Sequence, residues 1–129
     1  MKHFHDEPLI RIVDDEDEVR ESLCFMLECE GFRTASYASG ADFLRDFDSR
    51  RPGVVLLDVR MPEMSGIELQ HAMKMRGDTL PIIFISAHGD IDMAVKTMKD
   101  GAADFLSKPV TPERLLDAIE RAVKRDAKA

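Results

Sequence analysis

Short apolar runs alternate along the chain with segments in which apolar residues recur at helical spacing. The runs predict five β-strands, at Leu9–Val13, 32–37, 54–57, 81–86 and Asp104–Ser107. The third and fourth runs are apolar on both faces, which is typical of central strands in a parallel sheet. The second run mixes polar and apolar residues, as expected for an edge strand.

Helical patterns fill the intervals between these strands and predict five helices. The expected apolar positions are Val19, Leu23, Met26 and Leu27 before a stop at Gly31; Leu44 and Phe47 after a cap at Ser39; Leu69, Ala72 and Met73 after a cap at Ser65; Ala94, Val95 and Met98 in a thin stripe ended by Gly101; and Leu115, Ile119, Ala122 and Val123 after a cap at Thr111. Regular alternation of strands and helices predicts an α/β fold, with a parallel sheet covered by helices on both faces.

Composition narrows the class of protein. The chain has 129 residues, 44% hydrophobic and 33% charged, which fits one domain over residues 1–129. Its formal net charge of −7 argues against direct nucleic-acid binding by this domain. No apolar run is long enough for a membrane span, and the first residues lack a secretory signal. Cys24 and Cys29 match no disulfide or metal spacing, so we expect reduced thiols and a cytoplasmic location.

Polar residues with chemical potential stand at the carboxyl ends of the predicted strands. They are Asp14 and Asp15 after the first strand, Asp58 after the third, Ser86 at the end of the fourth and Lys108 after the fifth. Ligands of open α/β sheets bind outside the carboxyl ends of the strands, near the switch point in strand order. If the first, third, fourth and fifth strands are neighbours, these five side chains share one pocket.

Three carboxylates in one pocket need a cation. At ~4 Å and an effective dielectric of about 20, each pair repels by about 4 kcal/mol, and one lysine does not neutralise three negative charges. All-oxygen ligands favour Mg²⁺, which needs one or two carboxylates together with waters and phosphate oxygens. An aspartate beside such an ion can attack phosphorus and form an acyl phosphate. Ser86 and Lys108 would then bind the phosphoryl oxygens.

Taken singly, each residue has a simpler interpretation. Asp14 and Asp15 could cap the first helix, Ser86 could be an ordinary loop residue, and Lys108 could be a solvated lysine. Asp58 is harder to explain in that way, because a carboxylate at the end of a buried strand is costly without a partner. The coincidence of all five at strand ends favours the phosphoryl site.

Four segments carry a resemblance to a known family: IRIVDDEDEVRESL, VVLLDVRMPEMSGIEL, PIIFISAHGD and GAADFLSKPV. Together they resemble the response-regulator receiver domain of bacterial two-component signalling, over about residues 8–126. The resemblance implies a flavodoxin-like (βα)5 fold with strand order 2-1-3-4-5. The chain is most similar to receivers of FixJ-type transcriptional regulators. The output domain of those regulators is absent here. We therefore interpret residues 124–129 as the start of a linker or the end of an excised receiver.

The resemblance also implies roles for individual residues. Asp58 resembles the phosphoacceptor, and Asp15 and Asp14 resemble the acids of the Mg²⁺ site, the first binding directly and the second through water. The backbone carbonyl of Arg60 would complete the metal ligands. Ser86 resembles the switch hydroxyl. Lys108 resembles the phosphate-binding lysine and is expected to precede a cis peptide bond.

Phe105 stands at the family's aromatic switch position, although a core phenylalanine would look the same in sequence. A sensor histidine kinase would donate the phosphoryl group. Phosphorylation would reshape the face built from the fourth helix and fifth strand and favour a homodimer. Arg60 and His88 would flank the path of the hydrolytic water, with Arg60 slowing dephosphorylation unless it is simply solvated. The expected activity is limited to the domain's own phosphorylation and dephosphorylation.

The sequence leaves three competing functions open. A haloacid-dehalogenase-type phosphatase also uses a strand-end aspartate, but it needs a second aspartate where Arg60 stands. A receiver-like interaction domain could signal without phosphorylation, although such domains usually lack one of the five key residues. Metal binding by His3 and His5 is the third alternative.

Overall fold

The computed structural model describes residues 7–46, 51–87 and 91–128, and its elements follow the predicted order. The strands are β1 (Leu9–Val13), β2 (Arg33–Tyr37), β3 (Gly53–Asp58), β4 (Ile82–Ser86) and β5 (Asp104–Ser107). The helices are α1 (Asp17–Cys29), α2 (Gly40–Asp46), α3 (Gly66–Met75), α4 (Ile91–Lys99) and α5 (Pro112–Lys128). Asp58 and Ser86 are the last residues of their strands, so the strands reach the site directly.

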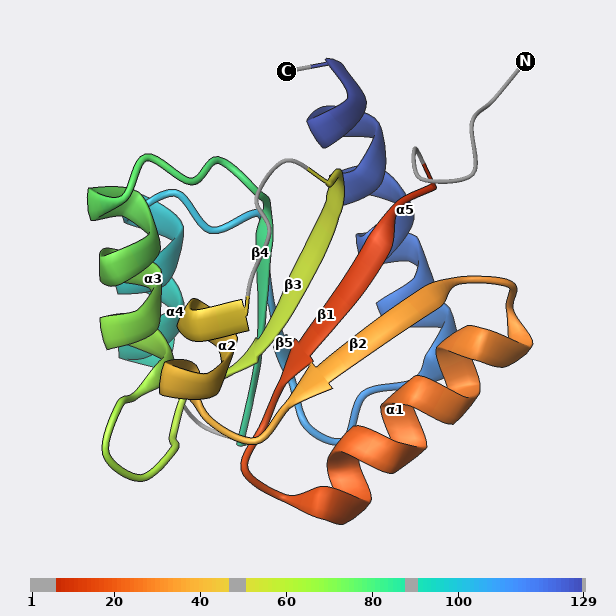
Figure 1. Ribbon diagram of the computed structural model, residues 1–129, viewed down its shortest axis with the longest axis horizontal. Coiled ribbons are helices and arrows are strands. Elements are labelled where there is room, and N and C mark those ends of the chain that lie inside the picture. The colour runs from red at the N-terminus through yellow and green to blue at the C-terminus, as the bar shows by residue number, and fades with distance from the viewer. Residues whose placement is uncertain (1–6, 47–50, 88–90, 129) are drawn as a thin grey trace.

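All four strand pairings are parallel, and the strand order is β2-β1-β3-β4-β5, which confirms the predicted flavodoxin-like fold. β2 lies at one edge, as its mixed sequence indicates. The five strands point the same way, so their carboxyl ends gather at the lower edge of the sheet in Figure 1. Order reverses between β1 and β3, which places the switch point beside the ends of these strands.

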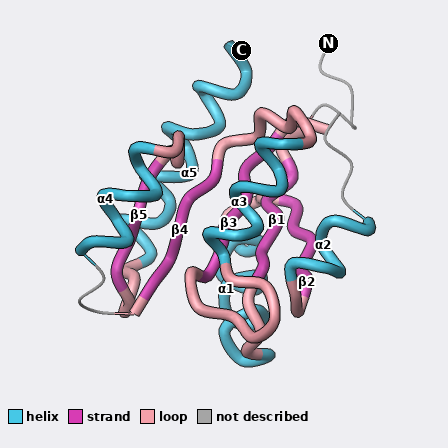
Figure 2. The backbone as a smooth tube through the Cα atoms, turned by 90° about the vertical axis from the view of Figure 1, so that its left-hand side faces the viewer, coloured by secondary structure: helices cyan, strands magenta, loops and turns pink. Residues whose placement is uncertain are grey.

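Each face of the sheet has its own core. Ile10, Ile12, Val54 and Leu56 face α1 and α5, whereas Val13, Val55 and Leu57 face α2, α3 and α4. Figure 2 shows the second helix layer from outside, with α4, α3 and α2 in front of the strands. The alternation of these side chains between the two faces explains why β3 is apolar from Val54 to Leu57, and why β1 is apolar except at Arg11. None of the described helices is both long and apolar enough to cross a bilayer.

Helix caps agree with the sequence. Ser65 accepts a hydrogen bond from the backbone N–H of Glu68, whose side chain accepts one from the Ser65 N–H, so the two form a capping box. Ser39 and Thr111 also accept hydrogen bonds from backbone N–H groups three residues on. Gly31 follows α1 with a φ of 91°, a conformation that glycine adopts without strain.

One predicted apolar face was incomplete, and another was wrong in detail. In α2 the prediction missed Phe43, whose side chain is completely buried. The predicted Leu44 is half-buried and packs against the same core, and Phe47 lies outside the described residues. In α4, Val95 and Met98 are 50% and 45% exposed. The buried residue of that helix is Thr97, whose hydroxyl donates to the Ala94 carbonyl. The helix is rotated so that most of its apolar side chains face solvent.

Candidate phosphoryl and metal site

Three carboxylates meet at the carboxyl edge of the sheet. Oxygens of Asp14, Asp15 and Asp58 all lie within 4.8 Å of one another. Asp14 and Asp58 are buried and Asp15 is exposed, so the cluster opens to solvent on one side. The register explains the meeting, because β1 pairs with β3 up to Val13 and Leu57, immediately before Asp14 and Asp58.

Lys108 is the cation of this cluster. Its ammonium lies 3.7 Å from Oδ2 of Asp14 and 3.8 Å from Oδ1 of Asp58. The backbone N–H of Lys108 donates to the Ser86 carbonyl at 2.7 Å, which extends the β4–β5 pairing to the site. The Lys108–Pro109 peptide bond is cis, as the resemblance implied. Three carboxylates and one ammonium leave an excess of negative charge.

Burial and the neighbouring acids both change the ionisation of Asp58. The pKa of its carboxyl is raised from 3.8 to about 6, first by burial and then by the charge of Asp14. The Lys108 ammonium and a hydrogen bond from the backbone N–H of Arg60 oppose this increase in pKa, while Asp15 adds to it. At neutral pH the Asp58 carboxylate is therefore mostly ionised, although burial and the neighbouring acids disfavour its charge.

The donor set fits Mg²⁺. A hard divalent cation prefers carboxylate oxygens, and its charge would relieve the repulsion that raises the pKa of Asp58. The exposed side of Asp15 leaves room for the waters that Mg²⁺ keeps. The sequence placed these acids together correctly. The Arg60 carbonyl as a further ligand stays a prediction.

The two residues predicted to act as a switch, Ser86 and Phe105, lie on the next two strands, β4 and β5. Ser86 is completely buried at the end of β4. Phe105 on β5 is half-buried, with its ring centroid 6.1 Å from that of Phe84. It is thus neither a full core residue nor a freely exposed one. Arg60 is exposed, and His88, His3 and His5 lie outside the described residues.

Gly66 is a residue whose role sequence reasoning missed. A Cβ built on it would lie 2.2 Å from the carbonyl oxygen of Asp58, and its N–H donates to the Val59 carbonyl at 2.8 Å. Only glycine permits α3 to begin this close to the strand end. The glycine directly after the Ser65 cap was the available signal.

A second missed contact joins the helices. The amide of Gln70 on α3 is buried and donates to the Thr97 carbonyl of α4 at 3.2 Å. A polar residue on the inward face of α3 was the signal, because buried amides need partners. This hydrogen bond joins α3 to α4, a helix that buries few apolar side chains.

Comparison with known proteins gives a consistent result. The family model described as the response regulator receiver domain matches residues 10–120. The response regulator protein TmoT of Ectopseudomonas mendocina is 47% identical over 124 residues, covering 95% of this chain and 56% of TmoT. The transcriptional regulatory protein FixJ of Rhizobium meliloti (strain 1021) is 45% identical over 113 residues, covering 88% of this chain and 55% of FixJ.

Solved structures agree. The crystal structure of FixJ-N matches with a TM-score of 0.86 and 43% identity, covering 92% of this chain and 94% of that one. The response regulator StyR matches with a TM-score of 0.90 and 43% identity, covering 95% of this chain and 62% of that one. The chain spans about half the length of the curated relatives it matches.

Proposed function

The chain belongs to the response regulator receiver domain family, and on that premise we propose that Asp58 accepts a phosphoryl group from a sensor histidine kinase. The observation that carries the proposal is the position of Asp58. It is a buried carboxylate at a strand end, within 4.8 Å of two further acids and 3.8 Å from an ammonium. Receivers as a class interact with histidine kinases.

The proposed transfer is a displacement at phosphorus. An Oδ atom of Asp58 forms a bond to phosphorus while the bond from phosphorus to the kinase imidazole breaks, and the electron pair stays on that nitrogen. Asp58 must be ionised to attack, and its pKa of about 6 leaves it mostly ionised at pH 7.5. Lys108 already lies beside this carboxylate and would bind a phosphoryl oxygen.

Receiver domains generally bind Mg²⁺ at their acidic pocket, and we assign that role here to Asp14, Asp15 and Asp58, with the Arg60 carbonyl. When bound, the ion neutralises negative charge on the transferred group. The three acids would hold the cation, and Lys108 would hold a phosphoryl oxygen. Both are needed, because a phosphoryl group would otherwise enter a cluster that already has excess negative charge.

The switch we propose runs from Asp58 to α4. A phosphoryl group adds roughly −1.5 to −2 charges, toward which the Ser86 hydroxyl turns, and the half-buried Phe105 moves into the space beside it. α4 follows because few buried side chains hold it. Its apolar residues Ile91, Val95 and Met98 are exposed and would form the contact in a symmetric homodimer.

The biological output is proposed from the longer relatives. The relatives TmoT and FixJ are longer regulatory proteins, so we propose that this receiver controls transcription through an output domain in a full-length protein. Dimerisation would align two such domains. The acidic receiver would not itself contact nucleic acid. We expect it to act in the cytoplasm, as response regulators generally do.

Arg60 is proposed to slow the loss of the phosphoryl group. Its side chain is exposed two residues after Asp58, where it can lie across the acyl phosphate and obstruct water. We expect Arg60→Ala to shorten the acyl-phosphate lifetime several-fold, measured by the decay of the phosphorylated mass. An unchanged lifetime would mean that Arg60 is a solvated residue.

The deciding experiment is acyl-phosphate formation. The chain and its Asp58→Asn variant are incubated with acetyl phosphate, with and without Mg²⁺, and intact mass and oligomeric state are followed. We expect one added phosphoryl group that requires both Mg²⁺ and Asp58, together with a shift to dimer. Mg²⁺ binding without modification by acetyl phosphate or by a histidine kinase would instead indicate a phosphorylation-independent interaction domain.

A further inference from the structure

Arg20 reaches back from α1 to the end of β1. Its Nη1 donates a hydrogen bond to the backbone carbonyl of Asp14 at 2.6 Å, and its Nη2 pairs with the carboxylate of Asp17. The Arg20 side chain is 16% exposed, whereas that of Asp17 is 79% exposed. The ion pair therefore lies at the surface, and the covered part of the guanidinium is the part that contacts Asp14.

The carbonyl that Arg20 binds belongs to the peptide that joins Asp14 to Asp15. Asp14 is buried, its N–H donates to the Tyr37 carbonyl at 3.2 Å, and its carboxylate accepts from the Glu16 N–H at 2.9 Å. Asp15 is exposed, so packing does not fix the direction of its carboxylate. A hydrogen bond to the preceding carbonyl fixes the plane of that peptide, and with it the direction in which the Asp15 side chain leaves the backbone.

We propose that Arg20 is a positioning residue for the cation site, because it fixes the Asp14–Asp15 peptide so that the Asp15 carboxylate faces Asp58. The inference rests on the proposed Mg²⁺ site but adds a residue outside its ligands. It also gives a prediction with a definite sign. The guanidinium charge alone repels a cation, so removing it would tighten Mg²⁺ binding if Arg20 acted only through charge. Removing it weakens binding if Arg20 acts through position.

Mg²⁺ affinity is measured directly by calorimetry, with Mn²⁺ electron paramagnetic resonance as a second reading. The variants are Arg20→Gln and Arg20→Lys. Arg45→Gln is the matched control, because Arg45 forms the same i,i+3 pair with Asp42 on α2, on a side chain that is 67% exposed. Outer partners of metal ligands typically contribute 10- to 100-fold in affinity. We expect Arg20→Gln to raise the Mg²⁺ Kd about 10-fold and Arg45→Gln to change it less than about twofold.

A second reading separates positioning from general damage. With acetyl phosphate, the Mg²⁺ concentration for half-maximal phosphorylation should rise in Arg20→Gln, while the extent at saturating Mg²⁺ stays at the wild-type level. Arg20→Lys keeps the charge but loses the fixed two-pronged contact, so its Kd should rise as well. It also serves if Arg20→Gln fails to fold.

The outcomes are distinct. An unchanged or lower Kd in the folded Arg20 variants overturns the positioning role, and so does an equal loss in Arg45→Gln. A wild-type chain that binds no Mg²⁺ overturns the proposed site itself, independently of Arg20.

Discussion

The two ends of the sheet both hold buried charge, but they hold it differently. Toward the amino end, the buried Arg11 of β1 donates hydrogen bonds to the carbonyls of Leu9 and Arg51, at 3.4 and 2.9 Å. At the carboxyl end, the buried Asp14 and Asp58 have one ammonium between them, at 3.7 and 3.8 Å. In the first arrangement the charged guanidinium has hydrogen-bond acceptors beside it. The second leaves charge in excess, which is what a site for a cation requires.

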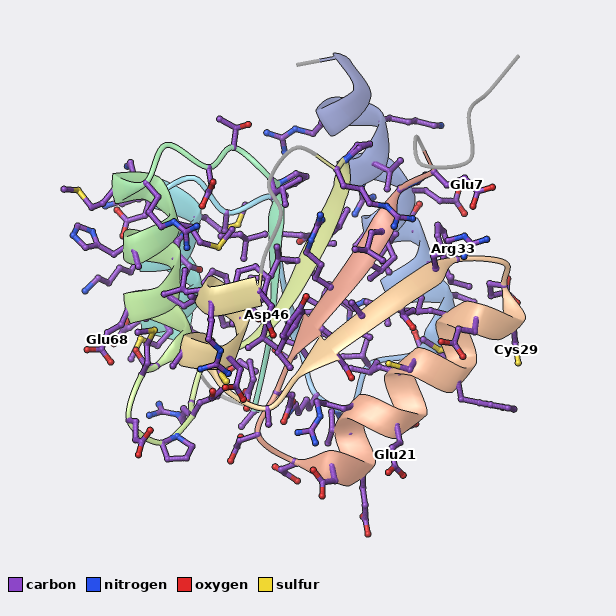
Figure 3. All side chains as sticks on the ribbon, in the orientation of Figure 1. Glu7, Glu21, Cys29, Arg33, Asp46 and Glu68 are labelled. Carbon is purple, nitrogen blue, oxygen red and sulfur yellow. The ribbon has the colours of Figure 1, made fainter. Side chains whose placement is uncertain are left out.

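The surroundings strengthen the contrast. Near the start of the sheet, Arg33 pairs with Glu7 at 3.0 Å, and both side chains lie together at the surface (Figure 3). This pair joins one cation to one acid. At the other end, the acids outnumber the cation, and burial keeps the pKa of Asp58 near 6. The amino end therefore supports stability, whereas the carboxyl end keeps a buried carboxylate at a cost in stability.

The largest expected effect is at Arg11. We expect Arg11→Ala to lower the free energy of unfolding by roughly 3 kcal/mol, because it removes a buried side chain and leaves carbonyl acceptors without their donor. Arg11→Met keeps the apolar stem and should lose about half as much. Urea denaturation measures both. Equal loss in the two variants would assign the whole effect to hydrogen bonding.

Substitution of Asp58 should change the free energy of unfolding in the opposite direction. Its native pKa is raised, so the folded chain binds the proton more tightly than the unfolded chain does. Ionisation therefore costs no stability below about pH 3.8, costs progressively more between pH 3.8 and 6, and costs a constant amount above pH 6. Asp58→Asn should stabilise the metal-free chain by about 2 to 3 kcal/mol at pH 7.5, and by little at pH 4.

Urea denaturation at the two pH values gives this difference, and Mg²⁺ provides the control. A ligand that binds only the folded state at ten times its Kd stabilises by about 1.4 kcal/mol. The wild type should gain this stability from Mg²⁺ and Asp58→Asn should gain less. A stabilisation by Asp58→Asn that is equal at both pH values would show that the charge of Asp58 is not its cause.

The smallest effect is expected at the surface pair. Arg33→Gln should lower the free energy of unfolding by less than about 0.5 kcal/mol, because exposed ion pairs contribute little. Adding salt should reduce the difference further. Thermal unfolding at low and high salt measures it. A loss near that of Arg11→Ala would mean that the amino end depends on its surface charges.

The sequence was sufficient for the strands, their parallel arrangement and the site acids, because these depend on local patterns. A run of apolar residues that ends in Asp58 places that residue at the carboxyl edge of a parallel sheet. Arg20 and Gly66 were not predictable in the same way. Their roles depend on distances between backbone segments, 2.6 Å to one carbonyl and 2.2 Å for an added Cβ, which no spacing of residues expresses.

The error at α4 has a physical reason. Helical periodicity identifies an apolar face but assumes that this face is turned inward. In α4 the buried residue is the polar Thr97, whose carbonyl accepts a hydrogen bond from Gln70 of α3, and the apolar residues Val95 and Met98 are exposed. A pattern of apolar residues does not show whether the face they form is turned toward the core or toward solvent.

This arrangement of α4 has a consequence for how such proteins diverge. The exposed positions Ile91, Val95 and Met98 can be exchanged at little cost to folding, because they contribute little to the core. The acids and Lys108 sit on other elements and are unaffected by such exchanges. A duplicated gene could therefore acquire a new binding partner through α4 alone, while its phosphorylation chemistry stays the same.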